Sequence, residues 1–387
     1  MASLLLAVIY LAFIRLGLPD SLLGSGWPAM HGFFAAPLSA AGVIAMVISG
    51  GTILSSLASE RLTKKLGTRY VTLGSVVLTA AALWGFSVST RFWMLCLGAI
   101  PYGLGAGSID AALNNYMALH YTSRDMSWLH CFWGVGTILS PQIMSRALVR
   151  ASWQTGYRTV ALIQLGIALA LALTLPLWRA HAGDTSEEDS GKLLGIRGAL
   201  RLRGAPELLG AFFCYCSAES VCMLWAASYL VTVRGVGVER AAAFGSLFFI
   251  GMTAGRFLAG LVSNRLGDRN MILLGFAVAV TGAAVIALPG LPETGALAGF
   301  VIVGLGCAPV YPSIIHSTPV LFGADNSRAL IGLEMASAYV GSTFMPPLFG
   351  ALSTAAGMGI LPLFVGAFLI AMLLLAERLG QKTRPTK

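Results

Sequence analysis

The chain has 387 residues, of which 57% are hydrophobic and only 11% charged, and its mean hydropathy is +0.80. A water-soluble protein of this composition would expose apolar surface and aggregate, whereas side chains that face lipid in a bilayer are themselves apolar. The net charge of +9 comes from Lys and Arg scattered between apolar runs, a pattern that argues against a nucleic-acid partner and indicates topology signals and contacts with anionic lipids.

Apolar runs of the length needed to cross a bilayer, about 20 residues, recur along the whole chain. The first run begins at Ser3 without a basic stretch or a cleavage site, so we expect a membrane helix and not a signal peptide. The sequence predicts an all-α membrane protein with twelve transmembrane helices, arranged as two pseudo-symmetric six-helix bundles. The predicted spans are 4–25, 38–59, 70–88, 92–118, 127–148, 157–178, 208–232, 241–262, 270–288, 295–319, 328–352 and 358–378.

Two ionisable residues, Arg15 and Asp20, interrupt the first predicted span. Arg15 lies about 16 Å from the start of the helix, near the middle of the bilayer. Asp20 points to a different side of the helix, next to Gly17 and Pro19, which weaken the helix and free backbone groups of the kind that line transporter cavities. Asp20 is therefore either a proton carrier or a residue at the helix end in an external vestibule.

The fourth and fifth predicted spans carry a second group of polar residues. Asp110 and Asn114 are four residues apart and share a helix face, and Asn115 follows them. Because Asp110 and Arg15 have similar expected depths, we expect them to pair, either to fasten the bundle or to exchange partners when substrate or a proton binds. The asparagines can bind hydroxyl-rich ligands or neighbouring helices, and His130 is either a proton relay or a structural hydrogen-bonder.

Residues 179–207 form the one long polar stretch of the chain. The predicted domains are therefore a bundle at 1–178, a cytoplasmic linker at 179–207 and a second bundle at 208–387. Within the linker, residues 192–203 are either a flexible segment or an amphipathic helix on the surface of the anionic leaflet. Most of the 25 Lys and Arg residues fall in loops on the same side as this linker, which predicts that both termini are cytoplasmic.

The second half has its own polar and aromatic residues inside predicted spans. Glu219 lies near the middle of helix seven, where a carboxylate and aromatic rings such as Trp225 suit a sugar ligand, although the tryptophan can equally pack within the bundle. Tyr311 and His316 interrupt helix ten and are further candidate ligands. Arg256 and Glu334 lie nearer the cytoplasm, where they either form a closing contact with each other or pair locally.

The two halves repeat each other at intervals of about 200 residues. The matching positions are Gly51, Leu66, Gly67, Arg69 and Leu73 in the first half and Gly251, Leu266, Gly267, Arg269 and Leu273 in the second. Two parallel six-helix halves joined by a long loop are a transporter architecture.

The segment from Gly260 to Arg269 resembles the loop signature of the major facilitator superfamily, with Asn264 at the position that is usually acidic. The resemblance covers essentially the whole chain and implies a gating role for Arg69, Arg265 and Arg269. Three further segments look like the fucose–proton symporter branch of that superfamily. They are Gly17-Leu-Pro-Asp20, Gly105-Ala-Gly107-Ser-Ile-Asp110 with Asn114, and Leu129-His130 followed by Gly134 and Gly136. Glu219 fits the same branch, whose members mostly import sugars by using ion gradients.

These features favour a monomeric secondary transporter of the inner membrane that imports a small polar solute, such as a sugar, together with protons or Na⁺. Proton coupling is expected at Asp20, Asp110, His130 and Glu219. Substrate contacts are expected at Arg15, Asp110, Asn114, Asn115, Glu219, Trp225, Tyr311 and His316, and gating at Arg256, Glu334, Arg69, Arg265 and Arg269. Motifs for a catalytic centre, a metal or a cofactor are not found in the sequence. The alternatives are a proton-driven exporter of drugs or lipids, with a more apolar cavity, and a membrane receptor that does not transport.

Overall fold

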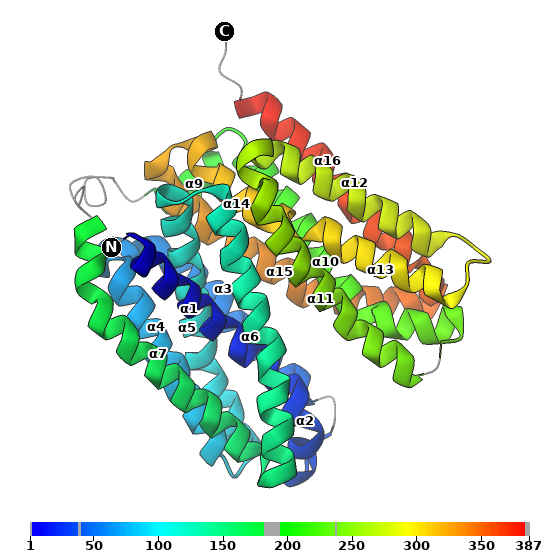
Figure 1. Ribbon diagram of the computed structural model, residues 1–387, viewed down its shortest axis with the longest axis horizontal. Helices are drawn as coiled ribbons and strands as arrows, with labels where there is room; N and C mark the ends of the chain where they lie inside the picture. The colour runs from blue at the N-terminus through cyan, green and yellow to red at the C-terminus, as the bar shows by residue number, and fades with distance from the viewer. Residues whose placement is uncertain (1, 38–39, 182–193, 237, 384–387) are drawn as a thin grey trace. The chain divides into compact units, whose positions relative to one another are not determined.

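The computed structural model describes residues 2–37, 40–181, 194–236 and 238–383, and within these ranges all regular structure is helical. The chain divides into two compact units (Figure 1). The first unit comprises residues 1–116 and 132–195, and the second comprises residues 117–131 and 196–387. The predicted all-α fold is confirmed, while the predicted domain boundaries at 178 and 207 stay a prediction.

Seven helices precede the linker, and most of their residues lie in the first unit. They are α1 (Ala2–Asp20), α2 (Leu22–Phe33), α3 (Ala41–Leu66), α4 (Thr68–Val88), α5 (Phe92–His120), α6 (Ser123–Arg150) and α7 (Trp153–His181). The first predicted span is thus two helices, which meet at a turn at Ser21. Pro19, which lies inside α1 just before this turn, cannot donate a backbone hydrogen bond.

Most of the second unit follows the linker, whose described residues contain one short helix, α9 (Gly195–Arg201). The unit then contains α10 (Ala205–Arg234), α11 (Val238–Leu266), α12 (Asp268–Ala287), α13 (Glu293–Cys307), α14 (Val310–Phe322), α15 (Ala324–Ala356), the 3₁₀ turn η2 (Met358–Ile360) and α16 (Leu361–Thr383). Predicted span 295–319 is interrupted at Ala308 and Pro309, between α13 and α14. Residues 192 and 193 of the predicted amphipathic helix lie outside the described residues.

Two equivalent connections show the internal repeat in the backbone. Gly67 joins α3 to α4 with a φ of 78°, and Gly267 joins α11 to α12 with a φ of 75°. Each glycine donates its N–H to the preceding helix, to Thr63 O at 2.7 Å and to Ser263 O at 2.8 Å. Because a positive φ is strained for residues with a Cβ, the matching glycines are required by the same tight turn in both halves.

Nine helical segments of the described chain are long and apolar enough to cross a membrane. They are Leu4–Trp27, Ala41–Leu66, Thr68–Val88, Phe92–His120, Trp153–Trp178, Ala205–Arg234, Asp268–Ala287, Glu293–Phe322 and Met358–Thr383. The helices α6, α11 and α15 are also long, with 28, 29 and 33 residues, and occupy the positions of the three other predicted spans.

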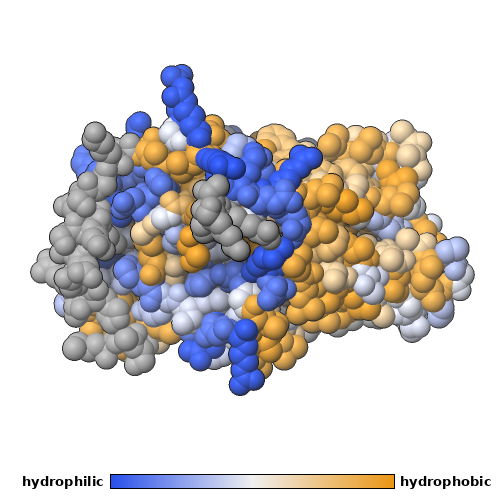
Figure 2. All heavy atoms as spheres, turned by 90° about the horizontal axis from the view of Figure 1, so that it is seen from above, coloured by the Kyte–Doolittle hydropathy of each residue, from blue (hydrophilic) through white to orange (hydrophobic). Residues whose placement is uncertain are grey.

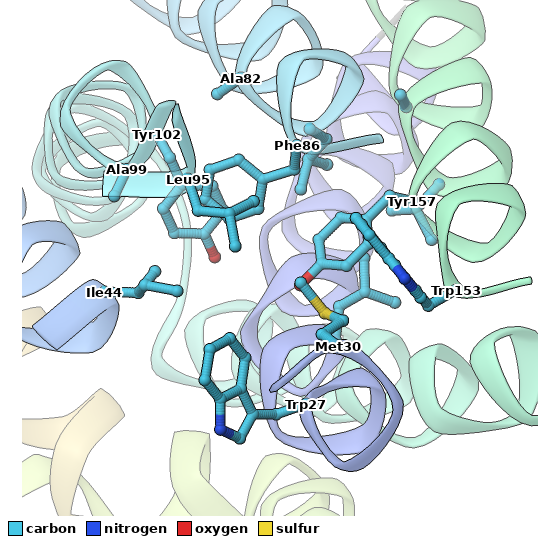
Figure 3. Packing of buried hydrophobic residues seen from close by; sticks show 14 of the residues in the cluster. Trp27, Met30, Ile44, Ala82, Phe86, Leu95, Ala99, Tyr102, Trp153 and Tyr157 are labelled. Carbon is cyan, nitrogen blue, oxygen red and sulfur yellow. The ribbon is translucent and has the colours of Figure 1, made fainter. Parts of the chain in front are cut away.

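Apolar side chains fill the interior of the first unit and also cover its outside. Trp27, Phe86, Tyr102 and Tyr157 belong to one buried cluster contributed by α2, α4, α5 and α7 (Figure 3). Large apolar side chains are nevertheless exposed on both units, and orange hydrophobic surface dominates the part of Figure 2 formed by the second unit. Examples are Met46, Leu54, Leu173, Leu261, Leu363 and Leu374. Such surface is expected where helices face lipid.

Candidate functional site

The buried guanidinium of Arg15 is held within the first unit by two other helices. Its Nε donates to Gln164 Oε1 on α7, its Nη2 donates to Ser75 O on α4 at 3.3 Å, and Gln164 Nε2 donates back to Arg15 O at 2.9 Å. Within the described part of the chain, Nη1 has no hydrogen-bond partner. The expected Arg15–Asp110 pair is therefore not formed, because the side chain of Arg15 reaches α4 and α7 instead.

Asp20, an exposed residue, lies at the end of α1. Its Oδ1 accepts a hydrogen bond from the Tyr102 hydroxyl on α5 at 3.1 Å, and its Oδ2 accepts one from Trp133 Nε1 on α6 at 2.9 Å. The ring of Tyr102 is fixed by the buried cluster shown in Figure 3. The site thus combines an acidic side chain with two oriented aromatic donors.

The polar residues of α5 behave as the four-residue spacing predicts. Asn114 Nδ2 donates to Asp110 Oδ1 at 2.8 Å and to Asp110 O at 3.0 Å. Asp110, Asn114 and Asn115 are all buried. The amide of Asn114 therefore orients the Asp110 carboxylate from one turn along the same helix.

In the second unit, Glu219 on α10 pairs with Arg256 on α11. Glu219 Oε1 lies 3.5 Å from Arg256 Nη2 and accepts a hydrogen bond from the Tyr215 hydroxyl at 2.8 Å. The same hydroxyl is 2.9 Å from Cys307 O, at the break between α13 and α14. These contacts form an acid–base–aromatic group in which three helices of one unit, α10, α11 and α13, meet.

The other aromatic candidates divide into two groups. Tyr311 on α14 packs against Tyr215, with ring centroids 6.3 Å apart, and against His130, with centroids 4.6 Å apart. These rings therefore extend the Glu219 group. Trp225 instead packs on α15, where its Nε1 donates to Pro346 O at 2.9 Å and its ring lies 5.8 Å from that of Phe349. For Trp225 the described contacts fit the bundle-packing alternative.

His316, in the middle of α14, lies in a separate cluster. Its Nδ1 is 2.7 Å from Asp268 Oδ2, and its Nε2 is 3.1 Å from Tyr121 O. Asp268 Oδ1 also accepts a hydrogen bond from Ser123 Oγ at 2.7 Å. Nearby, Asn264 Oδ1 accepts the Arg124 backbone N–H at 3.0 Å. The cluster ties the α5–α6 connection to α11, α12 and α14, and it occupies both ring nitrogens of His316.

The expected closing contact between Arg256 and Glu334 is not formed. Arg256 pairs with Glu219, and Glu334 Oε1 lies 2.9 Å from Thr318 Oγ1. The two residues extend from α11 and α15 toward different helices. Glu334 itself has no exposed surface.

The three arginines of the repeated loops lie at or near the surface. Arg269 Nη2 is 3.2 Å from both carboxylate oxygens of Glu377 on α16. The guanidinium of Arg69 lies 4.6 Å from the ring centroid of Tyr70, and Arg265 is exposed. In the first half, Glu60 accepts the backbone N–H groups of Leu194 and Gly195 at 2.7 and 3.0 Å, just before α9.

Sequence reasoning missed three residues that hold the polar groups of the first unit, namely Tyr102, Trp133 and Gln164. Gln164 was visible as the one amide inside the strongly apolar span 157–178. Trp133 lies beside Gly134 in the segment already singled out for His130. Tyr102 carried no signal, because an aromatic residue in a membrane helix usually packs against apolar neighbours.

Comparisons with known proteins agree with this architecture. A family model described as the Major Facilitator Superfamily matches residues 9–332 and, in a second match, residues 246–387. The chain is 26% identical over 309 residues to an uncharacterized MFS-type transporter of Yersinia pestis, covering 77% of this chain and 74% of that one. It is 23% identical over 337 residues to the membrane protein MosC of Rhizobium meliloti, covering 84% and 77%.

Two solved structures share the fold over nearly the whole chain. One is FucP, an MFS transporter in the outward conformation, with a TM-score of 0.80 and 18% identity over 96% of this chain and 97% of that chain. The other is the proton:xylose symporter XylE bound to 6-bromo-6-deoxy-D-glucose, with a TM-score of 0.80 and 13% identity over 99% and 96%.

Proposed function

This chain belongs to the Major Facilitator Superfamily, and we propose that it is a proton-coupled symporter that imports a small polar solute such as a sugar. Its family and its solved relatives are transporters, so the protein is a multi-pass membrane transporter and not an enzyme. The proposal concerns the solute, the coupling ion and the direction of transport.

The observation that carries the proposal is the Asp20 carboxylate held by Tyr102 and Trp133. Protonation of Asp20 would turn one of its oxygens from an acceptor into a donor, so either the Tyr102 hydroxyl would have to reverse and accept from it or the hydrogen bond from Trp133 would be lost. Proton binding is therefore linked to the positions of a tyrosine on α5 and a tryptophan on α6. This linkage is what a coupling residue needs.

The same group of side chains suits a hydroxyl-bearing solute. A carboxylate accepts hydrogen bonds from hydroxyl groups, and the flat ring of Trp133 can lie against the apolar face of a sugar. Asp110 and Asn114 supply further acceptors and donors on α5. The second unit has a carboxylate and an aromatic ring of its own, at Glu219 and Tyr311.

Two structural relatives support this choice of solute and ion. FucP is a fucose:proton symporter, and XylE is a proton:xylose symporter that was solved with a deoxy-glucose derivative bound. We further propose an inner-membrane location, cytoplasmic termini, a monomeric state, and contact of Arg197 and Arg201 of α9 with anionic lipid.

The test uses purified protein in proteoliposomes. A thermal-shift screen over sugars, drugs and lipids selects the ligand, and uptake of that ligand is then measured with and without an inward proton gradient. We expect a sugar to be accumulated against its gradient and a protonophore to abolish the accumulation. Asp20→Asn should abolish uphill accumulation and leave exchange of solute across the membrane intact, because the amide cannot carry the proton. Asp325→Asn, an exposed position at the start of α15, is the matched control.

Several outcomes would contradict the proposal. Accumulation that follows a Na⁺ gradient at constant pH would assign the coupling to Na⁺. Stabilisation by drugs or lipids and not by sugars would favour the exporter. Normal uphill accumulation by Asp20→Asn would remove Asp20 from the coupling mechanism.

A further inference from the structure

The second unit buries a carboxylate that the proposed solute site does not use. Glu334 lies about 15 Å along α15 from its start at Ala324, at 1.5 Å per residue, and has no exposed surface. Its Oε1 is 2.9 Å from Thr318 Oγ1 on α14. Its Oε2 is buried and has no hydrogen-bond partner among the described residues.

The ion pairs on the neighbouring helices are formed with residues other than Glu334. On α10, the helix packed along α15, the ionisable residues Glu207 and Glu219 pair with Lys382 of α16 and Arg256 of α11. On α14, His316 pairs with Asp268. Two tyrosines near this position have partners of their own: the Tyr215 hydroxyl donates to Glu219 Oε1, and the Tyr311 hydroxyl lies against Met335 Sδ. The remaining ionisable groups on these elements are the cysteine thiols of α10, Arg328 and Asp325 near the start of α15, and Glu377 and Arg378 on α16. Within the described ranges, Glu334 has no ion-pair partner.

The contacts of Thr318 indicate which partner donates. Thr318 Oγ1 lies 2.9 Å from Glu334 Oε1 and 3.2 Å from Ile314 O, but a hydroxyl group has only one proton. If Glu334 carries a proton on Oε1, its O–H donates to Thr318, and the Thr318 hydroxyl donates to Ile314 O. Both short contacts are then hydrogen bonds.

An ionised Glu334 would be far less favourable. Its charge would be buried with one hydrogen bond and, among the described residues, no ion-pair partner, whereas a neutral carboxylic acid avoids the cost of burying a charge. We propose that Glu334 is a proton-binding site of the second unit, which holds its proton toward Thr318 while α14 and α15 are packed as in this structure. The proton is released to water, leaving a carboxylate, when this packing opens. The use of this proton in transport rests on the proposed proton coupling, whereas its presence does not.

Infrared spectroscopy of the full-length protein in lipid tests the proton directly. We expect the carbonyl band of a protonated carboxylic acid in the wild type at about pH 7, where a free glutamate is ionised, and its loss in Glu334→Gln. Thr318→Val should shift the band because the hydrogen bond is lost, and Thr318→Ser should restore it. Spectra of the wild type and Glu334→Gln that are identical in the region of the carboxylic-acid carbonyl band would overturn the proposal.

Thermal stability gives a second measurement that works even where an infrared band is obscured. A carboxyl group that is neutral when folded and ionises on unfolding releases a proton, so the folded protein loses stability as pH rises. We expect the melting temperature of the wild type to fall relative to Glu334→Gln between about pH 5 and about pH 8, above the ordinary glutamate range. Glu377→Gln, which alters an exposed glutamate of the same unit, should show the same dependence of melting temperature on pH as the wild type.

The outcomes separate this inference from the proposed function. If the infrared band and the pH dependence of the melting temperature both show a proton on Glu334, but no solute moves with protons, the proposed function fails and the proton site stands. If proton-driven uptake is found but Glu334→Gln changes neither spectrum nor pH dependence, the proton site fails alone. Stabilisation of the wild type, and not of Glu334→Gln, by NaCl relative to choline chloride would make Glu334 a cation site and overturn the proposal.

Discussion

At Glu219 the carboxylate has two partners in its own unit, the Tyr215 hydroxyl and the Arg256 guanidinium. Sequence analysis identified Glu219 from its depth in an apolar helix, but it left open whether Arg256 pairs with Glu334 or locally. The difference has a physical cause. Depth follows from position along one helix, whereas the choice of partner depends on how α10, α11 and α15 are rotated and packed.

Glu219→Gln separates the charge of this group from its shape. The amide can still accept from Tyr215, but it cannot pair with Arg256 or give a bound solute hydroxyl a charged acceptor. A hydrogen bond to a charged group contributes about 1.5–3 kcal/mol, so we expect solute affinity to fall roughly tenfold to a hundredfold. Calorimetry in detergent across a range of pH measures this change, and Tyr215→Phe serves as the variant that keeps the charge. Unchanged affinity with unchanged pH dependence would make Glu219 a structural partner of Arg256.

At the scale of elements, α1 and α6 of the first unit cross at two glycines. A Cβ placed on Gly17 would lie 2.1 Å from Trp133 O, and one placed on Gly136 would lie 2.1 Å from Ile14 O. The backbones thus touch where α6 presents Trp133 to Asp20, and the close contact positions the candidate proton site. The sequence showed both glycines, but their opposition across two helices appears only in the folded unit.

Gly17→Ala should therefore separate α1 from α6. Overpacking typically costs about 1–3 kcal/mol, and we expect a lower melting temperature together with weaker proton-driven uptake, since the Trp133–Asp20 hydrogen bond would lengthen. Gly24→Ala is the matched control, because a Cβ on Gly24 meets nothing within 4 Å. Equal melting temperatures for the two variants would show that the helices do not need this close contact.

At the scale of the whole molecule, the α5–α6 connection groups with the second unit although most of both helices belongs to the first. The contacts of this connection with Asp268, His316 and Asn264 account for the grouping. Asp268 and Asn264 lie in the loop signature recognised in the sequence, where Asn264 replaces the usual acid. The loop signature thus holds the α5–α6 connection in place through hydrogen bonds.

Asp268→Asn should weaken the hydrogen bonds that hold the α5–α6 connection. An amide has one acceptor oxygen, so it cannot accept from both Ser123 and His316, and the loss of one charge-assisted hydrogen bond of about 1.5–3 kcal/mol favours local opening. We expect the backbone amides of 121–125 to exchange with deuterium roughly tenfold to a hundredfold faster. Arg269→Gln changes the adjacent residue, whose partner is Glu377, and should leave this exchange unchanged. Equal protection in the wild type and Asp268→Asn would show that Asp268 does not hold the connection.

The sequence by itself determined the properties that depend on short stretches of chain. Helix length, apolar faces, the glycine turns at Gly67 and Gly267, and the ionisable residues inside helices all follow from local composition and spacing. The tertiary structure alone decided which groups meet: Arg15 with Gln164, Asp20 with Trp133, and Glu334 with Thr318. These partners are brought together by helix rotation and packing across 16 to 149 positions of sequence, which no local pattern encodes.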